Sequence, residues 1–107
     1  KCIHQLFEEQ VEKTPNQIAV VFGDEKLTYA ELNLKANQLA HYLQKLGVKP
    51  EVIVGIYVER SPKFIISLLA VLKAGGAYLP LDSTLPQEAL EFRLQDAQAS
   101  VLIRDWE

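Results

Sequence analysis

The sequence predicts an α/β fold in which a parallel sheet is flanked by helices, a partial three-layer βαβαβ arrangement. The run "VIVGIYV" at residues 52–58 is apolar without alternation, which is typical of a parallel strand covered on both faces. Two more short apolar runs, at 77–81 and 100–104, follow segments whose apolar residues have helical spacing. The order from residue 52 onward is therefore strand, helix, strand, helix, strand, for which right-handed crossovers are expected.

The first part of the chain is expected to form a helix and a hairpin. Residues 3–13 place their apolar side chains on one helical face, and Pro15 disfavours a helical conformation at Thr14. The β-branched run at 17–23 predicts a strand that closes in a Gly-Asp turn. The short segment 25–27 can then return as the second strand of the hairpin.

The helix expected over residues 29–46 has the strongest local signals. Thr28 followed by Glu31 fits a capping box, in which each side chain satisfies an otherwise unpaired backbone donor. An apolar stripe continues along the segment, and Gly47 supplies the left-handed residue that ends it.

Prolines and a glycine set the boundaries in the second half. Ser61 and Pro62 are expected to open a helix through an N-cap and a proline in the first turn, and Gly75 is expected to end it. Pro80 places the strand 77–81 at an edge or at a strand end. Pro86 opens a final helix that runs to about Gln98, with Leu90, Leu94 and Ala97 facing inward.

Composition indicates one domain, or part of one, without an internal boundary in residues 1–107. With 49% hydrophobic residues and a net charge of −3, the chain can build a core and has no basic field to attract nucleic acid or anionic lipid. We expect no membrane helix, since no apolar run approaches about 20 residues, and no signal peptide. The single cysteine, Cys2, indicates a reducing, cytoplasmic location. Because the chain starts at Lys1 and lacks methionine, we expect it to be a piece of a longer polypeptide.

The glycine pair in "LKAGGAYLPLD" (72–82) stands beside a lysine, which raises the question of a phosphate-binding loop. A Walker loop needs its lysine and a Ser or Thr after the glycines, whereas Lys73 precedes them here. The dinucleotide fingerprint opens a helix, whereas this pair closes one. We therefore interpret Gly75 as the positive-φ residue at the helix end, and Gly76 as allowing close passage beside that helix.

Other chemically active residues give weak signals. His4 and His41 lack partners at ligand spacing, so no metal site is predicted, and Cys2 has no basic neighbour to make it a nucleophile. Asp82 and the triplet 59–61, Glu-Arg-Ser, follow strands at their carboxyl ends, where open α/β sheets bind ligands. The favoured alternative for Asp82 is a hydrogen bond to amides in the turn toward Pro86, and the triplet is likewise favoured as structural.

Two stretches together resemble the adenylation domains of nonribosomal peptide synthetases, in the acyl-adenylate-forming, AMP-binding superfamily. "LTYAELN" (27–33) is similar to the first core motif of these domains, and "LKAGGAYLPLD" to the second. The segment between the motifs and the lead-in "LFEEQVEKTPNQIAVVF" also resemble the family. The resemblance covers essentially the whole chain and implies the N-terminal part of this fold.

The resemblance implies a parent enzyme that uses ATP and magnesium to make an aminoacyl-adenylate, then passes the aminoacyl group to phosphopantetheine on a carrier domain. The family's phosphate loop, amino-acid pocket, ribose-binding aspartate and catalytic lysine have no matching position here. No catalytic, cofactor-binding or metal-binding residue is therefore assigned to this chain, which is expected to be inactive alone. The implied partners are the remainder of the domain and neighbouring condensation and carrier domains.

The resemblance weakens after Asp82. Family members tend to continue with Pro, then Tyr-Pro, then Glu-Arg-Leu, whereas "STLPQEAL" has Ser83, Leu85 and Ala89 in place of the proline, tyrosine and arginine. This change removes hydrogen-bond donors from the turn. Two alternatives stay open: a non-catalytic segment that associates with itself or a partner through an open strand edge near 100–104, and a relative that activates fatty or aryl acids.

Overall fold

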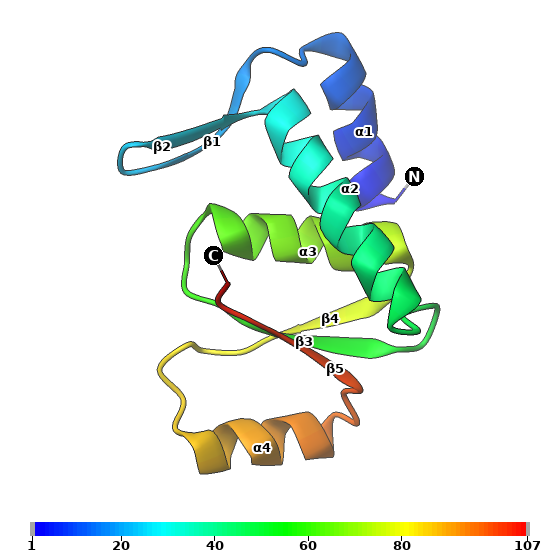
Figure 1. Ribbon diagram of the computed structural model, residues 1–107, viewed down its shortest axis with the longest axis vertical. Helices are drawn as coiled ribbons and strands as arrows, with labels where there is room; N and C mark the ends of the chain where they lie inside the picture. The colour runs from blue at the N-terminus through cyan, green and yellow to red at the C-terminus, as the bar shows by residue number, and fades with distance from the viewer. Residues whose placement is uncertain (1, 107) are drawn as a thin grey trace.

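A computed structural model describes residues 2–106, which form helices and strands in the expected order. Figure 1 shows a parallel sheet in the lower half and a helical region with a hairpin above it. The elements are α1 (Ile3–Lys13), β1 (Ile18–Phe22), β2 (Glu25–Thr28), α2 (Tyr29–Lys45), β3 (Ile53–Tyr57), α3 (Pro62–Ala74), β4 (Ala77–Pro80), α4 (Gln87–Asp96) and β5 (Val101–Arg104).

The sheet confirms the βαβαβ expectation. Its strand order is β4-β3-β5, and both neighbours pair with β3 in parallel. In the register, Gly55 of β3 lies between Leu79 of β4 and Leu102 of β5. Strand β4 is at an edge, as Pro80 predicts, since proline cannot donate to a further strand. Strands β1 and β2 form the separate antiparallel hairpin.

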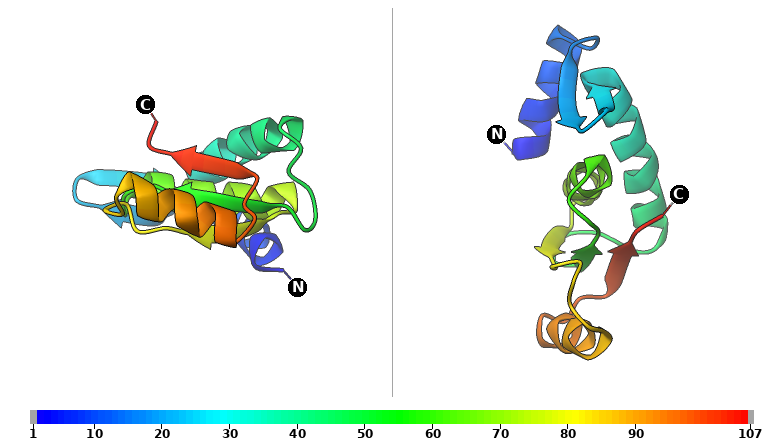
Figure 2. Two further views of the ribbon diagram at one scale, coloured as in Figure 1. Left: turned by 90° about the horizontal axis from the view of Figure 1, so that it is seen from below. Right: turned by 90° about the vertical axis from the view of Figure 1, so that its left-hand side faces the viewer.

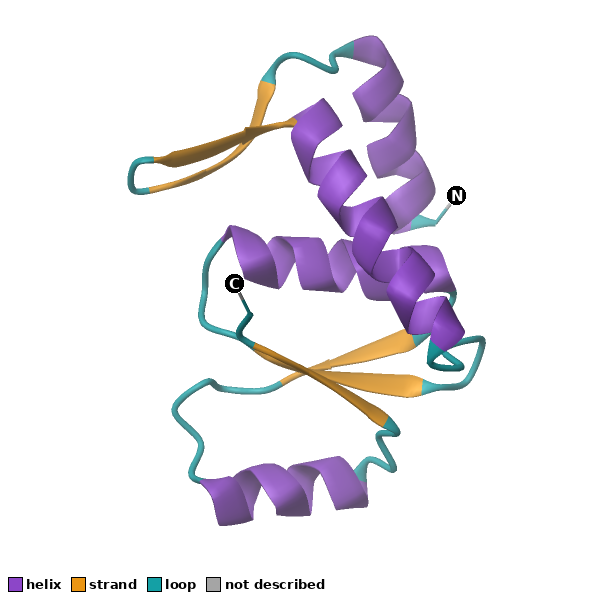
Figure 3. Cartoon of the chain, in the orientation of Figure 1, coloured by secondary structure: helices purple, strands orange, loops and turns teal. Residues whose placement is uncertain are grey.

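Helices cover both faces of this sheet, which gives three layers (Figure 3). Helices α2 and α3 lie on one face, and α4 lies on the other; the side view in Figure 2 shows the same separation. The chain passes from β3 to β4, on one side of β3, through α3 on one face of the sheet. It then passes from β4 to β5, on the other side of β3, through α4 on the opposite face. Opposite directions on opposite faces give both crossovers the same hand, as parallel βαβ units require.

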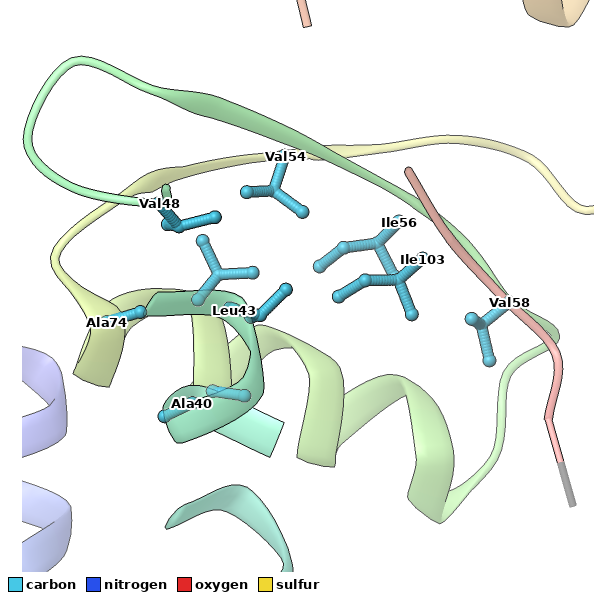
Figure 4. Packing of buried hydrophobic residues seen from close by; sticks show 10 residues of the cluster. Ala40, Leu43, Val48, Val54, Ile56, Val58, Ala74 and Ile103 are labelled. Carbon is cyan, nitrogen blue, oxygen red and sulfur yellow. The ribbon is translucent and has the colours of Figure 1, made fainter. Parts of the chain in front are cut away.

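The main core fills the space between the sheet and the helices α2 and α3 (Figure 4). Val54 and Ile56 of β3 are fully buried, and Leu43 of α2 is 1% exposed. The uniformly apolar β3 is thus covered on both faces, as its sequence predicts. Strand β5 contributes Ile103 to the same cluster.

Small side chains let α2 and α3 pack closely. Ala36 and Ala40 of α2, and Ala70 of α3, are at most 5% exposed. Ser67 is fully buried, and its hydroxyl donates a 2.8 Å hydrogen bond to the carbonyl oxygen of Lys63. This bond satisfies the hydroxyl without opening the apolar contact between the helices.

On the other face, the absence of a side chain at Gly55 lets α4 approach the sheet. A Cβ at this position would lie 2.7 Å from Leu94 Cδ2 and 3.1 Å from Leu81 Cδ1. Of the three residues expected to face inward, Leu90 is buried at 1% exposure, whereas Leu94 and Ala97 are half-buried. Gly55 therefore sets the distance between β3 and this helix.

The capping box at the start of α2 forms as predicted. The amide N–H of Glu31 donates to Thr28 Oγ1 at 3.1 Å, and the amide of Thr28 donates to Glu31 Oε1 at 2.9 Å. Gly47 has φ +100°, so the left-handed residue follows the helix as expected. Helical geometry itself ends at Lys45, with Leu46 as the C-cap.

The structure corrects two details at other helix starts. Ser61 occupies the N-cap position of α3, but its hydroxyl donates to the carbonyl oxygen of Glu59 at 2.9 Å instead of accepting from the helix. Pro86 is the N-cap of α4, so the helix begins at Gln87, and it ends at Asp96, before Gln98. The fixed φ of proline still aligns the entry into α4.

Candidate functional site

A cleft of about 610 Å³ lies where β3 and β4 end, and it is the candidate site. Its walls combine apolar side chains of several elements with three polar residues: Phe22, Val58, Phe64, Ile65, Pro80 and Leu81, with Arg60, Asp82 and Ser83. The sheet positions it, because the carboxyl ends of parallel strands meet at one edge.

The fold brings together only part of the predicted polar set. Arg60 and Asp82 line the same cleft, while Glu59 and Ser61 are not among its lining residues. Ser61 is instead engaged with the carbonyl oxygen of Glu59. The carboxyl-end rule therefore predicts the edge where this cleft lies but does not select which residues face it.

Asp82 has the structural role favoured from sequence. Its Oδ1 accepts hydrogen bonds from the amide N–H of Thr84 at 2.9 Å and from Thr84 Oγ1 at 2.7 Å. These donors, the backbone N–H first and the hydroxyl second, lower the pKa of the Asp82 carboxyl below its usual range. The carboxylate thus shapes the turn after β4.

The glycine pair closes α3, and the amides of both glycines bond to carbonyl oxygens of that helix. Gly75 has φ +91°, and its amide donates to the carbonyl oxygen of Leu72 at 3.1 Å. The amide of Gly76 donates to the carbonyl oxygen of Val71, also at 3.1 Å. Both N–H groups are therefore consumed at the helix end, where the last carbonyls need partners.

The contacts of Gly76 differ from the expected ones. A Cβ there would lie 2.7 Å from Val48 Cγ1 and 3.1 Å from the carbonyl oxygen of Val52, whereas Val71 of the preceding helix is 3.6 Å away. The close approach is mainly to the segment between α2 and β3. Sequence proximity pointed to the preceding helix, and the fold placed a different segment beside this glycine.

The sequence predicts no site at the two histidines or at the cysteine. His4 lies half-buried on α1, and His41 is exposed on α2. Within residues 2–106, no group of three or more His, Cys, Asp or Glu side chains could hold a metal ion. Cys2 is exposed and is a free cysteine. None of the helices in this part of the chain has the length and apolar character to cross a bilayer.

Two side-chain contacts in or near the second core motif were not predicted from the sequence. Lys73 pairs with Glu8, and the Tyr57 hydroxyl binds the carbonyl oxygen of Leu85. The second contact supplies a donor to the divergent 83–89 turn, where the sequence indicated that donors were missing. Both join residues 28 or more positions apart, so no local pattern could indicate them.

These features define an α/β framework. The first of its two motifs caps α2, and the second ends α3 and leads into β4. The family profile described as AMP-binding enzyme matches residues 7–107, and the chain belongs to this family. Its relatives and structural neighbours place it in the N-terminal region of an adenylation domain of the nonribosomal peptide synthetase type.

Among the relatives, tyrocidine synthase 3 of Brevibacillus parabrevis is 58% identical over 103 residues, which is 96% of this chain and 2% of that protein. Bacitracin synthase 3 of Bacillus licheniformis is 53% identical over 98% of this chain and 2% of its own length. The chain thus spans about 2% of these curated relatives.

Solved structures agree with this placement. The N-terminal subdomain of Klebsiella oxytoca NpsA, in complex with anthranilyl-AMSN, superposes with a TM-score of 0.90 at 34% identity, covering 98% of this chain and 28% of that one. The artificially fused adenylation–PCP di-domain NpsA-ThdA gives a TM-score of 0.92 at 34% identity, over 99% and 20% of the two chains. The expected adenylate-forming fold is therefore confirmed.

Proposed function

We propose that this chain is a structural segment of an ATP-dependent domain that activates an amino acid, and that the chain alone does not catalyse this reaction. The observation that carries the proposal is the engagement of the motif groups. The amides of Gly75 and Gly76 close α3, and Lys73 pairs with Glu8. The groups that could have held phosphate therefore hold the framework together.

ATP and magnesium are the cofactors proposed for the whole domain, but the second core motif described here does not offer a phosphate-binding loop. The second core motif has no free amide cradle, and Asp82 is engaged by Thr84. Metal-assisted neutralisation of phosphate charge would therefore depend on residues outside this segment. The contribution of this chain is to fix the sheet and its helices.

An amino acid is the substrate class that the relatives favour. Sequences at 53–58% identity are synthases of tyrocidine, bacitracin and gramicidin S. The aryl-acid alternative is supported by NpsA, whose subdomain binds anthranilyl-AMSN, but at 34% identity. The proposed partners are the rest of the domain, a condensation domain and a phosphopantetheine-bearing carrier domain, in the cytoplasm; the fused NpsA-ThdA di-domain provides a parallel for the carrier.

A chimera tests the framework role. Residues 7–107 would replace the matching segment of an adenylation domain in tyrocidine synthase 3, and amino-acid-dependent ATP–pyrophosphate exchange would be measured. We expect the chimera to keep exchange and the isolated chain to show none. Exchange by the isolated chain would defeat its proposed inactivity, and a folded chimera without exchange would contradict the framework role.

A second candidate function is self-association through the sheet edge. Within residues 2–106, β5 pairs with β3 alone, so one side of Val101–Arg104 offers backbone donors and acceptors. Such an edge can pair with another strand. Light scattering of the isolated chain would then show a dimer or a larger species, and a monomer at high concentration would contradict this function.

A further inference from the structure

Lys73, in the second core motif, contacts α1. Its Nζ lies 2.5 Å from Glu8 Oε2 and 5.8 Å from the centre of the Phe7 ring. The Lys73 side chain is only 6% exposed, whereas that of Glu8 is 47% exposed. The Lys73 side chain is thus largely covered, and its ammonium group lies near one carboxylate and one aromatic face.

Helix α1 is otherwise held mainly by Phe7, which packs against a buried cluster of residues from α2 and α3. None of its residues is buried, and Ile3 and Leu6 are 64% and 54% exposed. Phe7 is half-buried and lies against Tyr29 of α2, with ring centres 6.0 Å apart. An amphipathic helix is normally fixed by its buried apolar face, so where that burial is shallow the Lys73 contacts add to the attachment of α1.

Because Lys73 is largely covered, losing either Lys73 or Glu8 should weaken the attachment of α1. A desolvated ammonium group needs a charged or aromatic partner, so leaving Lys73 without Glu8 is unfavourable. Removing Lys73 leaves Glu8 at the surface, where it can be hydrated, and takes the cation from the Phe7 ring. Loss of either partner therefore weakens the same joint between α1 and α3.

We propose that Lys73 is a positioning residue that fixes α1 on α3, and that α1 opens as a local unit when this joint is broken. Lys73 lies in the last turn of α3, and both groups that it contacts, Glu8 and Phe7, lie on α1. The lysine of the motif therefore connects the first helix to the last turn of α3. This role does not depend on the activity proposed above.

Hydrogen exchange on the whole chain tests the proposal. In Lys73→Met, which keeps an apolar stem, amides of α1 should exchange about tenfold faster, while α2, α3 and the sheet keep their protection. Glu8→Gln keeps the Phe7 contact and an amide oxygen that can accept from the ammonium group, so it should raise exchange in α1 by a smaller factor. Combining both changes should add little to Lys73→Met, because the two residues form one interaction.

Matched controls separate this joint from general effects of charge. Lys45→Met removes an exposed lysine of α2, and Glu12→Gln removes an exposed carboxylate of α1; neither should change exchange in α1. Lys73→Arg retains the charge and the aromatic contact and should restore most of the protection.

Three results would overturn the proposal. They are unchanged α1 exchange in Lys73→Met, equal acceleration in every element, and an arginine variant that behaves like the methionine variant. If Lys73→Met fails to fold, Glu8→Gln decides the question alone. That variant changes a surface residue, so unchanged exchange in α1 would then reject the joint.

Discussion

The hydroxyl of Tyr57 donates a 2.6 Å hydrogen bond to the backbone carbonyl oxygen of Leu85. Tyr57 is the last residue of β3, and Leu85 lies in the turn that leads to α4. The Arg104 guanidinium, at the end of β5, lies 5.2 Å from the centre of the same ring. One side chain therefore connects the ends of two strands to the divergent turn.

Replacing Tyr57 with Phe should destabilise the chain by about 1 kcal/mol, because a half-buried carbonyl loses its donor while the ring is kept. Urea unfolding followed by circular dichroism measures the change. Tyr78→Phe on β4 is the matched control and should stay within about 0.5 kcal/mol of the parent. Equal effects of the two substitutions would show that the Leu85 contact contributes nothing specific.

Gly76→Ala should cost about 1–3 kcal/mol, since the new Cβ would be forced against Val48 Cγ1 and the carbonyl oxygen of Val52. Val48 is 3% exposed and cannot move aside freely. Thermal unfolding should also show that Val48→Ala partly offsets the cost when the two changes are combined. A neutral Gly76→Ala variant would mean that this close approach is not a packing constraint.

The capping box should make stability depend on pH through Glu31. The amide N–H of Thr28, then its hydroxyl, lower the pKa of the Glu31 carboxyl, with a further contribution from the charge of Lys35. A pKa that is lower in the folded chain gives stability that is present above the unfolded-state pKa and is lost as pH falls through the folded-state value.

Unfolding midpoints of the parent should therefore decrease below about pH 4.3 by more than those of Glu31→Gln, which has no carboxylate to protonate. Glu12→Gln is the control, and its pH profile should follow the parent. Parallel profiles for the parent and Glu31→Gln would contradict the contribution of this cap.

The turn at Asp82 allows the two causes of its lowered pKa to be separated. Thr84→Val removes the hydroxyl donor and leaves the backbone N–H, so the pKa of Asp82 should rise toward the usual value without reaching it. Thr84→Ser keeps both donors and should leave the pKa unchanged. Carboxyl-carbon NMR titration measures each value. If the pKa of Asp82 in Thr84→Val equals that in the parent, the hydroxyl is excluded as a cause.

Sequence reasoning succeeded where a few adjacent residues decide the conformation. The Thr28–Glu31 cap, the positive φ of Gly75 and the edge position of the strand with Pro80 all follow from local backbone chemistry. It failed at Ser61, whose hydroxyl donates to the carbonyl oxygen of Glu59 and does not accept from an amide of the helix N-terminus. Two local acceptor and donor choices of similar energy cannot be ranked without the surrounding geometry.

The sequence by itself determined the order of the elements, their caps and turns, and the family, because these depend on residues that are close along the chain. The tertiary structure decided which distant groups meet: Lys73 with Glu8, Tyr57 with Leu85, and Gly76 with the segment before β3. Those pairings follow from the β4-β3-β5 order and from helix packing on the sheet. Both arise only when non-local burial selects one arrangement of the elements.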